Sequence, residues 1–106
     1  MQSYKFSLDN RLGIYLPVLQ LEWDEYPEEE RAAILDCWEQ VRGRIPQRIM
    51  ELEGIINDKQ SQLNNEDNFK TACQLNSDIA ETASCINDLH LYFRINQDIA
   101  ANVIHR

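Results

Sequence analysis

Glycine and proline are scarce in this sequence, and above all in its second half. Three of each occur among 106 residues; every proline precedes residue 47, and Gly54 is the one glycine beyond that point. Because these residues interrupt helices and form tight turns, their depletion over residues 47–106 predicts long helices rather than a strand-and-turn fold. The same scarcity excludes a glycine-rich phosphate loop.

Basic residues are also in the minority. The chain has 10 lysines and arginines against 18 aspartates and glutamates, a formal net charge of −8. A nucleic-acid-binding protein normally offers a basic surface to the phosphates, so this balance disfavours nucleic acid as a partner. No apolar run approaches the length of a membrane span, and residues 1–6 lack the features of a signal peptide. We therefore expect neither a membrane nor a nucleic-acid partner.

The three cysteines form no pair that the sequence predicts to be bridged. Cys37, Cys73 and Cys85 show no CxxC spacing. The last two lie on one predicted helix, about 18 Å apart along its axis, which is too far for a disulfide. Free thiols are typical of a reducing compartment, so we expect buried cysteines in a cytoplasmic protein.

Residues from which an active site could be assembled are few. The only histidines are His90 and His105, and His90 has no carboxylate or cysteine at ligand spacing on its own face. Asn87 stands where the E-x-x-H pattern of di-iron bundles would need a glutamate. We therefore expect no metal, no cofactor and no catalytic residue, and we interpret His90 as a partly buried structural residue.

Residues 67–105 carry the clearest pattern, a repeat of apolar residues on alternating steps of three and four. This spacing over four heptads is typical of one long helix with a single apolar stripe. Two polar residues, Thr82 and Asn96, fill gaps in the stripe. Its apolar members are Ala72, Leu75, Ile79, Ile86, Leu89, Phe93, Ala100 and Val103.

Residues 27–64 repeat the same pattern and predict a first helix. Pro27 and the acidic residues 28–30 suit its first turn. Gly43 and Pro46 interrupt its middle although the apolar register continues past them, so the helix is either kinked or broken near residues 43–46. Its stripe consists of Leu35, Trp38, Ile45, Ile49, Leu52, Ile56 and Leu63, with Arg42 and Lys59 in the gaps.

The two stripes predict an all-α single domain, a long antiparallel helical hairpin that turns near residues 64–67. Folding the chain there would set Ile45 near Ile86 and Trp38 near Phe93. Two explanations stay open for the polar residues in the stripes: two hairpins associate as a dimeric four-helix bundle, or the contact between the helices is hydrated.

Residues 1–26 form an extension whose position is easier to predict than its conformation. Residues 4–8 alternate apolar with polar side chains and residues 14–19 are apolar throughout, which fits a β-hairpin or a loop leading to a short helix at Pro17. The end of the second helix is apolar on several faces. We expect residues 4–23 to cover that open end of the hairpin.

Two groups of residues are candidates for binding a partner. Arg42, Arg44 and Arg48 form the one basic cluster and could bind carboxylates or phosphates, unless Glu39 and Glu51 neutralise them locally.

Trp23 and Tyr26 stand among acidic residues, and such aromatics often dominate contact surfaces. The alternative is that Trp23 anchors the N-terminal segment on the helices.

These observations favour a protein–protein interaction module, a small cytoplasmic regulator or adaptor that binds its partner through a helical face. The alternative is a dedicated chaperone, for export or assembly, that shields an apolar segment of its client. An enzyme is not expected.

Overall fold

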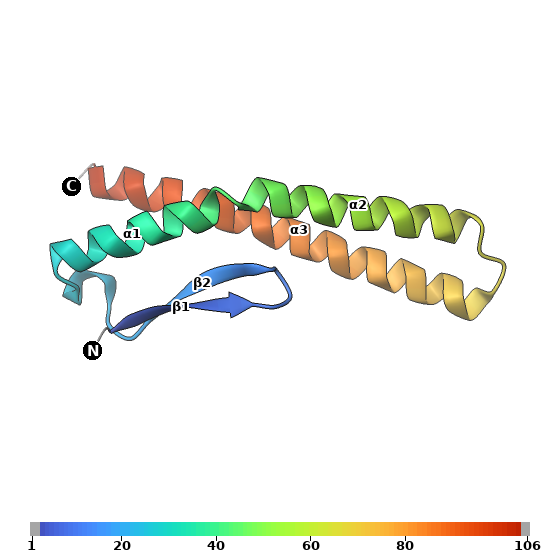
Figure 1. Cartoon of the computed structure of the whole chain (residues 1–106), viewed down its shortest axis with the longest axis horizontal. Helices are drawn as coiled ribbons and strands as arrows, with labels where there is room; N and C mark the ends of the chain where they lie inside the picture. Colours follow the sequence, from blue (N-terminus) through green and yellow to red (C-terminus); the bar gives the residue numbers. More distant parts are fainter. Residues whose placement is uncertain (1–2, 105–106) are drawn as a thin grey trace.

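The computed structural model describes residues 3–104, with side chains up to residue 95. It is elongated, with extents of 59 × 29 × 17 Å. Two long helical runs lie side by side and a small sheet flanks one half of them (Figure 1). In chain order the elements are β1 (Tyr4–Asp9), β2 (Ile14–Leu19), the 3-10 turn η1 (Trp23–Glu25), α1 (Glu28–Arg42), α2 (Ile45–Asn64) and α3 (Phe69–Ile104).

The predicted pair of long helices is confirmed, and the first of them is bent. α1 ends at Arg42 and α2 begins at Ile45, with both parts packed on α3. Gly43 and Arg44 keep φ,ψ values of −63°,−19° and −91°,−11°, so the backbone continues to advance almost as a helix. This explains why the apolar register survives the interruption. Pro46 lies in the first turn of α2, where its missing N–H is not needed.

α3 begins two residues later than the sequence pattern indicated. Its first turn is capped by Asn68, whose Oδ1 accepts the backbone N–H of Thr71 at 3.0 Å. The connection from α2 is two residues longer than expected but still short, as is usual between antiparallel neighbours (Figure 1).

The all-α class needs correction, because residues 4–19 form an antiparallel two-stranded sheet. Tyr4 pairs with Leu19 and Asp9 with Ile14. The connecting turn is closed by Asp9, whose Oδ1 accepts the N–H of Leu12 at 2.9 Å and whose carbonyl accepts the N–H of Gly13 at 2.7 Å. Gly13 has a φ of +75°, a conformation that favours glycine. Of the two alternatives, the structure shows the β-hairpin.

The core lies in the middle of the molecule, where the tip of the β-hairpin meets the start of α2 and the middle of α3. We call this region the junction. Ile45 and Leu89 are completely buried there, at 0% exposure each. Ile86, expected to lie near Ile45, packs against the cluster to which Ile45 belongs. The buried members of the junction are Leu12, Ile14, Ile45, Ile49, Leu52, Cys85 and Leu89.

Nearer the open end, the partner of Trp38 differs from the prediction by one residue. Its ring packs edge-on against Tyr92, with centroids 6.2 Å apart, rather than against Phe93. The ring of Phe93 lies instead beneath Arg42, whose guanidinium carbon is 4.6 Å from the ring centroid.

Polar residues within the stripes find partners inside the chain. Lys59 Nζ lies 3.2 Å from Asp78 Oδ2. The Thr82 hydroxyl donates to the carbonyl of Asp78 at 2.8 Å. These contacts account for Lys59 and Thr82 without a second copy of the chain. Asn96 lies outside the residues whose side chains are described.

A candidate partner-binding groove between the sheet and the helices

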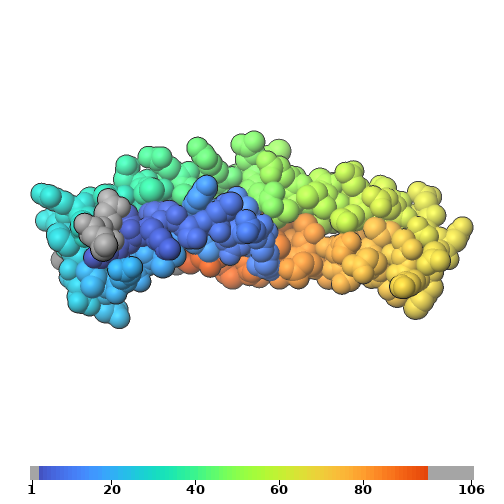
Figure 2. All heavy atoms as spheres, turned by 60° about the horizontal axis from the view of Figure 1, so that its bottom comes forward, coloured from blue at the N-terminus to red at the C-terminus, as the bar shows by residue number. Residues whose placement is uncertain are grey.

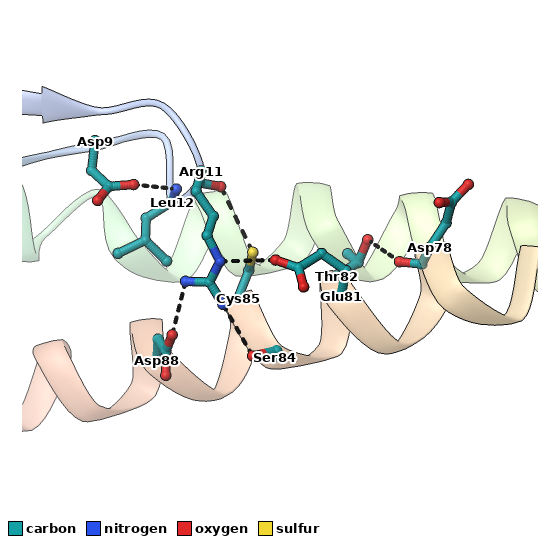
Figure 3. A network of polar contacts seen from close by, with 9 residues as sticks. All are labelled: Asp9, Arg11, Leu12, Asp78, Glu81, Thr82, Ser84, Cys85 and Asp88. Atoms are coloured by element: carbon teal, nitrogen blue, oxygen red, sulfur yellow. Dashed lines mark hydrogen bonds and ion pairs between the residues drawn. The ribbon is translucent and has the colours of Figure 1, made fainter. Parts of the chain in front are cut away.

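The tip of the β-hairpin is fixed to α3 by Arg11 (Figure 3). Its guanidinium donates to Glu81 Oε1 at 2.9 Å, to Asp88 Oδ2 at 2.8 Å and to Ser84 Oγ at 3.0 Å. The bond to Glu81, with a further one to Asp88, raises the pKa of Arg11 above its ordinary value. The hairpin is therefore held in place by a polar contact at its surface as well as by the buried side chain of Leu12.

Arg48 fixes the same tip from the other side. Its Nε donates to the carbonyl of Leu12 at 2.9 Å, and its Nη1 lies 3.1 Å from Glu51 Oε2. A Cβ placed on Gly13 would lie 2.5 Å from Arg48 Nε. The positive φ of Gly13 favours glycine, and a Cβ added there would also force the Arg48 guanidinium to shift.

Arg42 is also used inside the chain. Its Nη2 and Nε donate to the two carboxylate oxygens of Glu39 at 2.7 and 3.0 Å, and its plane lies over Phe93. The bond from Arg42 holds the pKa of Glu39 below its ordinary value and raises that of Arg42 itself. Of the three predicted arginines, Arg42 and Arg48 therefore follow the local-pairing alternative.

Arg44 differs from both. It lies at the bend between α1 and α2, and its side chain is exposed. Its guanidinium makes no hydrogen bond or ion pair with any residue whose side chain the structure describes. An arginine in this state keeps all its donors available for a carboxylate or phosphate.

Arg44 stands beside a groove of about 530 Å³ between the sheet and the helices. Phe6 and Tyr15, which lie on one face of the sheet, line the groove on the sheet side, next to Gly13 and Ile14. On the helical side Val41 lines the groove and Cys37 lies next to it. Figure 2 shows the sheet on the surface of the molecule over this part of the helices. The groove combines apolar surface with a cation that has no partner among the side chains that the structure describes.

Tyr26 is an internal anchor in this structure. It is 2% exposed, and its hydroxyl donates to the carbonyl of Ser3 at 2.6 Å. The same oxygen accepts the N–H groups of Gln20 and Leu21 at 3.1 and 3.3 Å. It therefore joins the two ends of the β-hairpin to the start of the helices. Trp23 is half-buried and packs on Tyr26 with ring centroids 6.4 Å apart.

Two expectations about single residues were wrong. Cys37 and Cys73 are exposed, and only Cys85 among the three cysteines is buried. His90 is exposed rather than partly buried. Among the side chains that the structure describes, those of residues 3–95, no group of three or more His, Cys, Asp or Glu is placed to hold a metal ion. Nor does that part of the chain contain a helix with the length and apolar character needed to cross a membrane.

Comparison of the chain with protein-family models, with curated proteins and with solved structures finds no match.

Sequence reasoning missed the sheet side of the groove. The alternation of apolar residues in residues 4–8 was visible, but the position of Phe6 and Tyr15 opposite Val41 depends on how the β-hairpin docks. That docking is made by Arg11 and Arg48, whose partners are distant in sequence.

Proposed function

We propose that this protein is an interaction module that binds a protein partner in the groove between β1–β2 and α1–α2. The observation that carries the proposal is the guanidinium of Arg44, which pairs with no described side chain and lies beside an apolar groove. Small-molecule and peptide sites commonly combine apolar walls with a few polar groups that fix orientation.

The partner would supply a segment with an apolar side chain and a nearby carboxylate. The apolar side chain would pack between Tyr15 and Val41, while the carboxylate would accept the fork of Arg44. The net charge of −8 opposes a long acidic segment at a distance, but this repulsion is screened beyond about 8 Å at physiological salt. A single carboxylate within an apolar segment suits the groove better than an acidic run.

The five residues expected to contact a partner take different roles in this proposal. Arg44 contacts the partner directly. Arg42, Arg48, Trp23 and Tyr26 shape the groove, because their contacts within the chain position the sheet and the bend. The binding surface therefore includes the sheet as well as a helical face.

The test is to compare partner capture by the wild-type chain with capture by Arg44→Glu and Tyr15→Ala. Arg94→Glu and Phe69→Ala are the matched controls, because both residues are exposed and lie outside the groove. We expect one protein to co-purify with the wild type and with both controls and to be lost from both groove variants. Equal capture by all five chains would overturn the proposal.

The chaperone alternative is favoured by one observation. Leu8, Tyr15 and Leu19 are 47%, 49% and 39% exposed. They share one face of the sheet, because Leu8 pairs with Tyr15, and Tyr15, Pro17 and Leu19 are alternate residues of β2. A client-shielding surface of this kind would bind a hydrophobic dye in the isolated protein. It would also bind many unrelated apolar peptides, with or without a carboxylate, and Arg44→Glu would leave that binding unchanged. Exposed free thiols fit a reducing, cytoplasmic location for either function.

A further inference from the structure

β1 is an edge strand whose outer side is open. The sheet has only the order β1–β2, and it is β2 that packs on α1. Figure 1 shows β1 on the side of the sheet away from that helix. A strand in this position presents unpaired backbone N–H and C=O groups to any second strand that approaches it.

The ladder shows which backbone groups these are. The N–H of Gln20 donates to the carbonyl of Ser3 at 3.1 Å, so Ser3 is directed at β2. In an antiparallel pair the residues directed at the partner alternate with those directed away. The backbone groups of Tyr4, Phe6 and Leu8 therefore point to the free edge.

The two edges of the sheet are not equivalent. By the same alternation, the backbone of Pro17 in β2 points away from β1, so the outer edge of β2 lacks a donor at its centre. β1 contains no proline. Lys5 is the one residue of β1 that commonly discourages edge pairing. Further strand pairing is therefore blocked at β2 and open at β1.

One antiparallel register of β1 with a second copy of itself brings opposite charges together. If two copies pair about a two-fold axis at Ser7, Lys5 of each copy lies opposite Asp9 of the other. Phe6 then lies opposite Leu8 with their backbone groups facing one another, as the alternation requires. Centring the pair on Lys5 or on Asp9 would instead place like charges opposite each other, which is destabilising.

Both charged residues are available for this contact. Lys5 is exposed, and its ammonium makes no ion pair within the described part of the chain. Asp9 uses only Oδ1 in the turn, where it accepts the N–H of Leu12, so Oδ2 is left over. Neither residue has to give up an internal contact on pairing.

We propose that two copies of this chain join β1 to β1 in that register, forming a continuous four-stranded sheet. With strands about 4.8 Å apart, the two β2 strands would lie about 14 Å from each other. Packed helices need 8–10 Å between their axes, which is less than the distance between the two β2 strands. The helices beside each β2 therefore do not collide across the two-fold axis. The inference does not rest on Arg44: it uses the backbone edge of β1, whereas the groove uses the side chain of Phe6.

The first experiment is sedimentation equilibrium of the full chain at several concentrations. We expect a dimer that Lys5→Glu weakens at least about tenfold, because both copies of the Lys5–Asp9 contact become like-charged. Lys70→Glu is the matched control: this exposed lysine on α3 makes no ion pair among the described side chains, and its replacement should leave the dimer unchanged. A wild-type chain that stays monomeric at every concentration up to roughly 1 mM overturns the proposal.

The second experiment tests the register. Ser7→Cys, made together with Cys37→Ser and Cys73→Ser, places two thiols on the two-fold axis at a Cα separation of about 4.5 Å, within reach of a disulfide. Mild oxidation should yield a covalent dimer, whereas Ser77→Cys in the same background should not. A dimer that resists Lys5→Glu and is not cross-linked through Ser7→Cys would use another surface, such as a four-helix bundle, and would overturn the proposal.

Discussion

The junction and the distal tip of the α2–α3 pair, residues 57–71, are built from the same two helices in opposite ways. At the junction three elements meet, and Ile45 and Leu89 are fully buried. At the distal tip only the two helices face each other, Leu63 is half-buried and Phe69 is 83% exposed. Two helices alone bury little apolar surface, so the β-hairpin supplies the third side that completes a core. Stability should therefore be concentrated at the junction, and the tip should open locally.

The largest difference is expected from removing buried side chains. Leu89→Ala should lower the free energy of unfolding by about 2–5 kcal/mol, because it leaves a cavity among three elements. Leu63→Ala, at the distal tip, should cost only about 1 kcal/mol, because that side chain is half-buried. Urea denaturation followed by circular dichroism measures both values. Equal losses would show that the core is not centred on the junction.

Two glycines offer a matched comparison with opposite signs. Gly13→Ala should destabilise the fold by about 1–3 kcal/mol, because its φ is +75° and its Cβ would meet Arg48. Gly54→Ala lies in α2 with nothing within 4 Å of the added Cβ, and it should stabilise by about 0.5–1 kcal/mol. Thermal unfolding shows whether each variant is more or less stable than the wild type. A Gly13→Ala chain as stable as the wild type would contradict the fixed hairpin turn.

A smaller effect is expected at the polar contact between the hairpin tip and α3. Arg11→Ala should increase amide hydrogen exchange in β1 and β2 while leaving exchange in the distal tip unchanged. Lys59→Ala is the counterpart, since it breaks the ion pair with Asp78 and should affect the tip alone. Loss of protection in both regions from either variant would mean that they do not open separately. High salt should reduce the difference between Arg11→Ala and the wild type.

The smallest effect is the pH dependence of two carboxylates. Hydrogen bonds from Arg42 lower the pKa of Glu39, and those from Gln74 and then Lys59 lower that of Asp78. A carboxyl whose pKa is lower in the folded state adds stability above its unfolded pKa and loses it as the pH falls through the folded value. Stability should thus decline below about pH 4. Glu39→Gln and Asp78→Asn should each flatten that decline. Unfolding curves measured at pH 3–7 test this, and a variant that loses as much stability as the wild type would contradict it.

The helices could be predicted from the sequence because their signal is local and repeated. The periodicity located α3 to within two residues at its start, and Gly43 with Pro46 marked the bend. The β-hairpin stayed one of two alternatives, because six apolar residues in a row fit a strand or a helix equally well. Its choice depends on burying Leu12 and Ile14 against residues of α2 and α3, and no local pattern reports such a contact.

The candidate site was predictable only in part, for the same physical reason. Three arginines close together in sequence looked alike, yet one binds Glu39, one binds the carbonyl of Leu12 and one makes no such contact. The partner of Arg48 lies 36 residues away, and that of Tyr26 lies 23 residues away. Distances of this kind depend on how the sheet docks, which composition and spacing do not encode.

The position of Leu12 also has a consequence for synthesis of the chain. The β-hairpin is made first, but its tip is buried by Leu89, and Arg11 reaches Asp88, 77 residues further on. While the ribosome is still translating the helices, the hairpin can close but its apolar tip has nothing to pack against. Until the last helix is made, Leu12 therefore lacks part of its core, and folding of the junction has to await that helix.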